Sequence, residues 1–204
     1  MKVKICGLQQ EEHVRESVSS GADFIGFVFA PSKRNVSIEQ AQKLVAMLPS
    51  TVKSVGVFVN PTKEELEETI QQVGLDIVQL HGDETAEFCA SISKPVIKAF
   101  SINSVEDFDQ TNDYPVDYHL VDAPGSTYRG GSGHTFDWSL IQNQQKKTSL
   151  ILAGGLSVEN ITQAIKTVKP YAVDVSSGVE TDGVKDGQKI QEFIQRAKAG
   201  SEQS

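Results

Sequence analysis

Residues 150–179 read LILAGGLSVENITQAIKTVKPYAVDVSSGV, and this stretch decides the fold. Two short apolar runs, Leu150–Ala153 and Tyr171–Val175, enclose a segment whose apolar residues recur at helical spacing. Apolar strands that alternate with helices are typical of a parallel sheet buried on both faces. A loop of small residues follows each run, Gly154–Gly155 after the first and Ser176–Gly178 after the second. The stretch therefore predicts two parallel strands joined by a helix, each strand ending in a glycine-containing loop.

The same unit recurs towards the amino terminus. Six further apolar runs are predicted as strands: Lys2–Cys6, Phe24–Phe29, Ser54–Val59, Ile77–Leu80, Val96–Phe100 and Tyr118–Asp122. Eight strand–helix pairs in 204 residues lie near the lower size limit of a (βα)8 barrel, roughly 200 residues. An open doubly wound sheet is the alternative, but it usually has fewer strands and a glycine fingerprint after the first one. We therefore predict the α/β class and a single TIM-barrel domain over residues 1–204.

Capping residues mark the starts of several helices. Ser, Thr and Asp side chains at such positions accept hydrogen bonds from the first free N–H groups of a helix. On this basis helices are expected to begin after Ser37, Thr62, Ser157 and Asp186, and a short one after Ser104.

Composition excludes several classes of protein. The chain carries 19 Lys and Arg residues against 27 Asp and Glu, a formal net charge of −8. This balance argues against nucleic acid or an anionic membrane surface as the main partner, but a local pocket can still bind a small anion. No signal-like segment follows Met1, and the two cysteines, Cys6 and Cys89, are too few for a disulfide scaffold. We therefore expect reduced thiols and a cytoplasmic protein, with monomer and homodimer both open.

A barrel of this type places its active site at the carboxyl ends of the strands, with phosphate favouring the last two loops. Those loops contain Gly154, Gly155, Ser176, Ser177 and Gly178. Glycine lets backbone N–H groups approach an anion closely, so the pair of loops predicts a phosphate site. The alternative for either loop alone is a tight turn without a ligand.

Five ionisable residues lie at or just after the carboxyl ends of predicted strands. Cys6, Asp122 and Asp174 end their strands, and the alternatives for them are packing, a turn or an ion pair. Arg34 offers a planar donor fork for a carboxylate or phosphate, or is simply a solvated charge. His81 is a candidate proton donor, ligand contact or support for another residue.

Two further features are less specific. The loop over residues 123–134 is long and glycine-rich, which suits a lid, a phosphate-binding loop or a surface excursion. Cys89 falls inside a predicted helix and is expected to pack in the core. The four histidines have no metal-ligand spacing, so no metal site is expected.

A set of motifs runs in order from the first strand to the last helix: Lys4–Leu8, Ile25–Phe29 with Ser32–Val36, Val78–Gly82, Gly130–Gly133 with Thr135–Trp138, Leu152–Leu156 and Val173–Glu180. This set resembles the phosphoribosylanthranilate isomerase family of tryptophan biosynthesis. Each motif alone is weak, but the ordered set is specific. Lys33 stands where many members carry Pro, and His134 where many carry Lys.

The resemblance implies an Amadori rearrangement of N-(5-phosphoribosyl)anthranilate without cofactor or metal, with this phosphoribosyl compound as the small-molecule partner. It implies that Cys6 is the general base, that Asp122 is the general acid and that Arg34 contacts the anthranilate carboxylate. It also implies phosphate binding by the two glycine loops and sugar binding by Asp174, and we add His81 to the substrate-binding residues. A cysteine base further requires that nearby positive charge lowers the thiol pKa from about 8.5.

Two alternatives remain at this point. The histidine-pathway isomerase performs the same rearrangement on another amine, but it would be expected to have a carboxylate at Cys6 and phosphate loops in both halves. A non-catalytic phosphosugar-binding module would need no paired acid and base, and turnover of substrate would exclude it.

Overall fold

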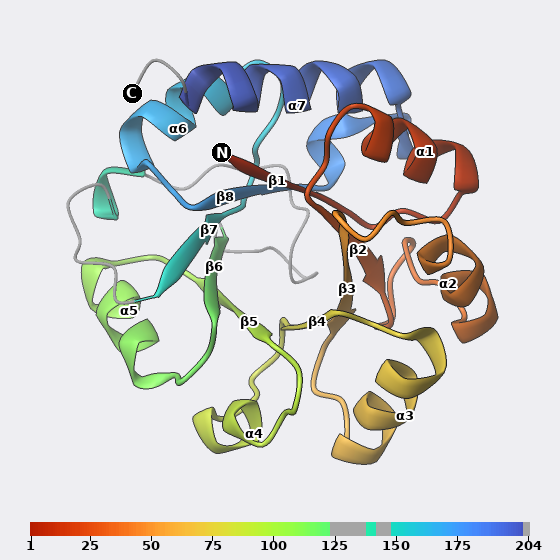
Figure 1. Ribbon diagram of the computed structural model, residues 1–204. Coiled ribbons are helices and arrows are strands. Elements are labelled where there is room, and N and C mark those ends of the chain that lie inside the picture. The colour runs from red at the N-terminus through yellow and green to blue at the C-terminus, as the bar shows by residue number, and fades with distance from the viewer. Residues whose placement is uncertain (123–137, 142–147, 202–204) are drawn as a thin grey trace.

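The computed structural model describes residues 1–122, 138–141 and 148–201. Eight parallel strands form a closed barrel in chain order, so that the last strand pairs with the first (Figure 1). They are β1 (Lys2–Cys6), β2 (Phe24–Val28), β3 (Lys53–Phe58), β4 (Ile77–Leu80), β5 (Val96–Ser101), β6 (Tyr118–Asp122), β7 (Ser149–Leu152) and β8 (Ala172–Val175). The predicted TIM barrel is confirmed, each strand end lies within one residue of its predicted position, and the open doubly wound alternative is wrong.

Helices surround the ring of strands (Figure 1). They are α1 (Glu11–Ser19), α2 (Ile38–Val45), α3 (Lys63–Val73), α4 (Ala86–Ala90), α5 (Val105–Gln110), α6 (Ile161–Val168) and α7 (Gly187–Ser201), with 3-10 turns η1 (Thr111–Asp113), η2 (Trp138–Leu140) and η3 (Ser177–Val179). A two-stranded hairpin of β9 (Glu180–Thr181) and β10 (Val184–Lys185) precedes α7. Between β6 and β7 the described residues contain only η2. Among the helices that can be described, none is long and apolar enough to cross a bilayer.

Most of the predicted helix starts are confirmed. Ser37 accepts a hydrogen bond from the backbone of Gln40, Thr62 forms a capping box, and Ser104 caps the short helix α5. The Asp186 carboxylate accepts from the backbone N–H groups of the first turn of α7.

The predicted helix start at Ser157 is confirmed only in part. The Ser157 hydroxyl accepts from the Glu159 N–H at 3.3 Å and its carbonyl from the Ile161 N–H at 3.1 Å, but residues 158–160 form a turn and helix α6 begins at Ile161. This turn is held by the side chain of Asn160. Its Oδ1 accepts from the Ser157 N–H at 2.9 Å, and its Nδ2 donates to the Gly155 carbonyl at 2.8 Å. The loop after β7 is therefore longer than a direct strand-to-helix turn.

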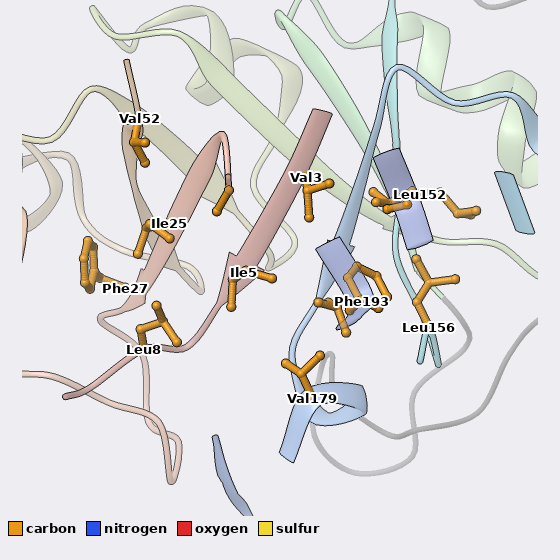
Figure 2. Close-up of a cluster of buried hydrophobic side chains, with 14 of the residues drawn as sticks. Val3, Ile5, Leu8, Ile25, Phe27, Val52, Leu152, Leu156, Val179 and Phe193 are labelled. Carbon is orange, nitrogen blue, oxygen red and sulfur yellow. The ribbon is translucent and has the colours of Figure 1, made fainter. Parts of the chain in front are cut away.

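The strands separate two layers of packing. Residues such as Val3 and Ile5 face the helices and pack with side chains that include Phe193 of α7 (Figure 2). The interior of the barrel holds a second apolar cluster of buried residues: Phe24, Val55, Ile77, Ile97, Ala99, Leu120, Ile151, Ala153 and Ala172. Because side chains alternate along a strand, the neighbours of Val3 and Ile5, Lys4 and Cys6, point into the barrel. The polar interior thus begins where β1 approaches its carboxyl end.

Candidate active site

Three of the predicted reactive residues end strands at the same mouth of the barrel. Cys6, Asp122 and Asp174 lie at the carboxyl ends of β1, β6 and β8, which all point the same way because every strand pairing is parallel. Cys6 is 8% exposed and Asp122 is 5% exposed. This mouth therefore holds a thiol and two carboxylic acids in surroundings that are largely shielded from water.

A buried ion pair explains why the apolar strand β8 tolerates an acid. Lys4 and Asp174 are register partners on β1 and β8, and the Lys4 Nζ lies 2.9 Å from Asp174 Oδ1. The Lys4 side chain is completely buried. Burial alone would lower its pKa, but Asp174 and Cys6 outweigh this effect, so the pKa of Lys4 is raised and the amine stays charged. Sequence analysis missed Lys4.

The Cys6 thiol has charged neighbours of both signs. Burial raises its pKa most strongly, the positive charge of Lys4 opposes this, Asp174 adds to it, and Lys185 opposes it. The net result is a raised pKa. The cations that a cysteine base requires are present, but burial and Asp174 outweigh them in this arrangement.

His81 stands beside Asp122 on the other side of the mouth. Its Nε2 lies 3.7 Å from Asp122 Oδ2, and its Nδ1 lies 3.1 Å from Nε2 of the buried Gln79. The Gln79 amide holds one ring nitrogen, and the other faces the carboxyl group. The structure therefore brings His81 together with the predicted acid.

Buried hydrogen bonds and an ion pair hold the loop that carries His81 in place. The Gly82 N–H donates to both carboxylate oxygens of Glu84, at 3.0 and 2.9 Å. The Lys98 Nζ lies 3.2 Å from Glu84 Oε2 and donates to the Gly82 carbonyl at 2.9 Å. Glu84 and Lys98 are both buried, so this ion pair fixes the backbone directly after His81.

Arg34 is an ordered part of the site rather than a solvated charge. Its Nε and Nη2 donate to the two oxygens of Glu180 at 2.6 and 3.0 Å. Lys185 lies 3.0 Å from the same carboxylate and donates to the Ser176 carbonyl at 2.8 Å. Burial would raise the pKa of Glu180, but Arg34 and Lys185 lower it to about 2. One carboxylate thus ties the loop after β2 to the loop after β8.

The two predicted phosphate loops lie against each other. Gly154 and Gly155 have φ values of 81° and 63°, which only glycine adopts without strain. A side chain at Gly178 would overlap the Leu156 carbonyl oxygen, so the loop after β8 packs directly on the loop after β7. The Ser176 hydroxyl donates to the Cys6 carbonyl at 3.1 Å, which joins this loop to β1.

The sequence-predicted residues therefore gather at one end of the barrel, with some exceptions. The loop at 123–134, including His134, and the motif residues Gly130–Gly133 lie outside the described residues. Five ionisable residues of the site were missed, namely Lys4, Glu84, Lys98, Glu180 and Lys185, as was the amide of Gln79. Lys4 had a readable signal: with Lys2 and Cys6 it forms the polar face of an alternating strand.

Comparison with known proteins identifies relatives of the whole chain. The family model of N-(5'phosphoribosyl)anthranilate (PRA) isomerase matches residues 3–196. The N-(5'-phosphoribosyl)anthranilate isomerase of Listeria monocytogenes is 54% identical over 199 residues, which cover 97% of this chain and 98% of the relative. The crystal structure of phosphoribosyl anthranilate isomerase from Thermotoga maritima has a TM-score of 0.89 and 43% identity, covering 98% of this chain and 99% of that one.

A second solved structure carries a ligand. It is a phosphoribosyl anthranilate isomerase in complex with reduced 1-(o-carboxyphenylamino)-1-deoxyribulose 5-phosphate. It is 42% identical, has a TM-score of 0.86, and the match covers 98% of this chain and 99% of that one.

The Glu180 network predicts a pH-dependent contribution to stability. The pKa of Glu180 falls from 4.5 to about 2 in the folded protein, so its contribution is present above pH 4.5 and is lost as the pH falls through about 2. We expect Glu180→Gln to lower the free energy of unfolding by about 3 kcal/mol at pH 7 and by less than about half of that at pH 3. Urea unfolding measured across this range tests the prediction.

Glu192→Gln is the matched control. It removes an acid from an exposed pair with Arg196 on α7, and such pairs contribute little. A loss in Glu180→Gln that is the same at both pH values would contradict an ionised carboxylate paired with Lys33, Arg34 and Lys185.

Proposed function

This chain belongs to the N-(5'-phosphoribosyl)anthranilate isomerase family and is an isomerase of tryptophan biosynthesis, and we propose that Cys6 is its general base and Asp122 its general acid. The observation that carries the assignment is the placement of the two groups. They end β1 and β6, which are separated around the closed barrel by β7 and β8. A base and an acid in this arrangement approach a substrate in the mouth from different sides, as two separate proton transfers require.

The substrate is N-(5'-phosphoribosyl)anthranilate, and the product is 1-(2-carboxyphenylamino)-1-deoxyribulose 5-phosphate. We assign the phosphate to the backbone N–H groups of Gly154, Gly155, Ser176, Ser177 and Gly178. The packing of the two loops against each other supports this assignment, because it gathers their N–H groups at one place.

The other contacts follow from charge and position. Arg34 binds the anthranilate carboxylate, and Asp174 accepts hydrogen bonds from the sugar hydroxyls. The clamp on Arg34 from Glu180 supports a fixed position for its guanidinium group, which still has donors besides the two that Glu180 occupies. His81 orients the Asp122 carboxyl group and lines the substrate site beside it.

Ring opening is the first chemical step. Asp122 gives its proton to the ring oxygen, the C1–O bond breaks, and the nitrogen lone pair forms a C1=N bond. This bond makes the substrate an iminium ion, or Schiff base, and turns the ring oxygen into a hydroxyl group. The buried position of Asp122 supports this role, since poor solvation favours the protonated form that a donor needs.

Proton abstraction from C2 follows. The Cys6 thiolate forms an S–H bond as the C2–H bond breaks, and the freed electron pair becomes a C1=C2 double bond. The iminium electrons return to nitrogen, which cancels its charge. The resulting enol-amine takes a proton at C1 and loses one from the 2-hydroxyl group, which leaves the ketone.

Replacement of the thiol tests the base. Cys6→Ser keeps the size of the side chain but leaves a hydroxyl group that is far too weakly acidic to form the anion. We expect kcat to fall by about 10²–10⁴ with little change in KM, measured by the loss of anthranilate-type substrate fluorescence. Cys89→Ser is the control, because burial raises the pKa of that thiol to about 11 and its helix α4 lies outside the site. A near-normal kcat in Cys6→Ser would show that another group is the general base.

The pH profile of kcat tests the acid. The rate should fall at low pH as Cys6 is protonated and at high pH as Asp122 ionises. Asp122→Asn removes the transferable proton, so most of kcat and the high-pH limb should disappear. Asp109→Asn, at an exposed position on α5, should leave the profile unchanged. A high-pH limb that survives in Asp122→Asn would assign the acid to another group.

A further inference from the structure

The Lys4 side chain is completely buried, and the proposed reaction steps assign no role to its amine. Its ion pair with Asp174 compensates its charge. Stability alone does not explain this pair, because apolar residues of similar volume often stabilise a fold equally well. The surroundings of its Nζ point to a second partner, the sulfur of Cys6.

A glycine on the neighbouring strand makes room for this contact. Gly26 of β2 is the register partner of Cys6 on β1. A Cβ at Gly26 would lie 2.8 Å from Cys6 Sγ and 3.2 Å from Lys4 Nζ. Sulfur and ammonium therefore border the same small space, while the Lys4 Nζ donates to Asp174 Oδ1 at 2.9 Å.

The charges around Cys6 favour an anion at this place. Lys4 faces the thiol from β1, Asp174 from β8 and Lys185 from β10, while β2 contributes only Gly26. Lys185 in turn shares Glu180 with Arg34. Among these described side chains, three mostly buried cations thus face two carboxylates, and a thiolate at Cys6 would balance the charge.

We propose that Lys4 is the positioning residue of Cys6: it donates to Asp174 beside the sulfur, and sugar hydroxyls that donate to Asp174 release Lys4 to stabilise the thiolate. The proposal rests on the proposed function, in which Cys6 takes the C2 proton. The thiol proton leaves to solvent when the sugar binds, and Lys4 keeps its own three protons throughout. The base is thereby generated where and when the substrate is bound.

The direction in which the Cys6 pKa is shifted agrees with a competition between Asp174 and Cys6 for Lys4. Burial and Asp174 raise the pKa of the thiol while Lys4 lowers it, so the carboxylate competes with the sulfur for the same ammonium. A hydroxyl group that donates to Asp174 delocalises its negative charge and weakens its hold on Lys4.

The test measures thiolate formation directly. In the full chain with Cys89→Ser, the rate of Cys6 alkylation by iodoacetamide is followed against pH, which reports the thiolate fraction. The pH at which this rate is half-maximal is the midpoint of thiolate formation. We expect Lys4→Met to raise this midpoint by about one pH unit or more, which is a tenfold or greater loss of thiolate at neutral pH. Lys4→Arg keeps the charge and should restore most of the thiolate. Asp174→Asn removes the competitor and should move the midpoint down.

Binding of the sugar is tested with ribose 5-phosphate, followed by the ultraviolet absorbance of the thiolate. This probe should lower the midpoint in the wild type and leave it unchanged in Asp174→Asn. If the pH midpoint of thiolate formation does not move in Lys4→Met, the ion pair has only a structural role. If Lys4→Met does not fold, an unchanged midpoint in Asp174→Asn leads to the same conclusion. These readouts need no turnover, so they remain valid even if Cys6→Ser shows that the base lies elsewhere.

Discussion

The ion pair between Lys4 and Asp174 is the contact on which the rest of the site depends. It joins the first strand to the last across the seam that closes the barrel, and it lies directly beneath the Cys6 thiol. Because Lys4 is shielded from water, solvent screens its charge only weakly from the few groups around it. Asp174 therefore compensates the buried amine of β1, and Lys4 compensates the acid in the apolar strand β8.

A second set of charges extends this arrangement outward. Glu180 holds Arg34 and Lys185 together, and Lys185 reaches the Ser176 carbonyl, while the Ser176 hydroxyl reaches the Cys6 carbonyl. The groups assigned to the anthranilate carboxylate, the phosphate and the C2 proton are therefore linked by a chain of hydrogen bonds, charge-assisted at Glu180 and Lys185, rather than set on independent loops. On the other side, Glu84 and Lys98 do the same for the backbone next to His81.

Much of this molecule could be read from local sequence. The apolar strands, the capping residues at Ser37 and Thr62, and the strand-end positions of Cys6 and Asp122 depend on nearby residues and on the rule that parallel strands share one active end. Partnerships across the seam could not be read, because Lys4 meets Asp174 and Arg34 meets Glu180 only after the barrel closes. The start of α6 could not be read exactly either, because the Asn160 side chain bonds to the Ser157 N–H and the Gly155 carbonyl and holds a turn ahead of the helix. The raised pKa of Cys6 depends on burial, which no local motif reports.

The most direct measurement is a crystal structure of this chain with reduced 1-(o-carboxyphenylamino)-1-deoxyribulose 5-phosphate. We expect the C2 carbon to lie about 3–3.5 Å from Cys6 Sγ, the separation of reacting atoms, with the sugar hydroxyls on Asp174 and Lys4 turned to the sulfur. The phosphate should lie on the loops after β7 and β8. A ligand whose C2 faces away from Cys6, or whose phosphate binds elsewhere, would contradict the roles assigned to both strands of the seam.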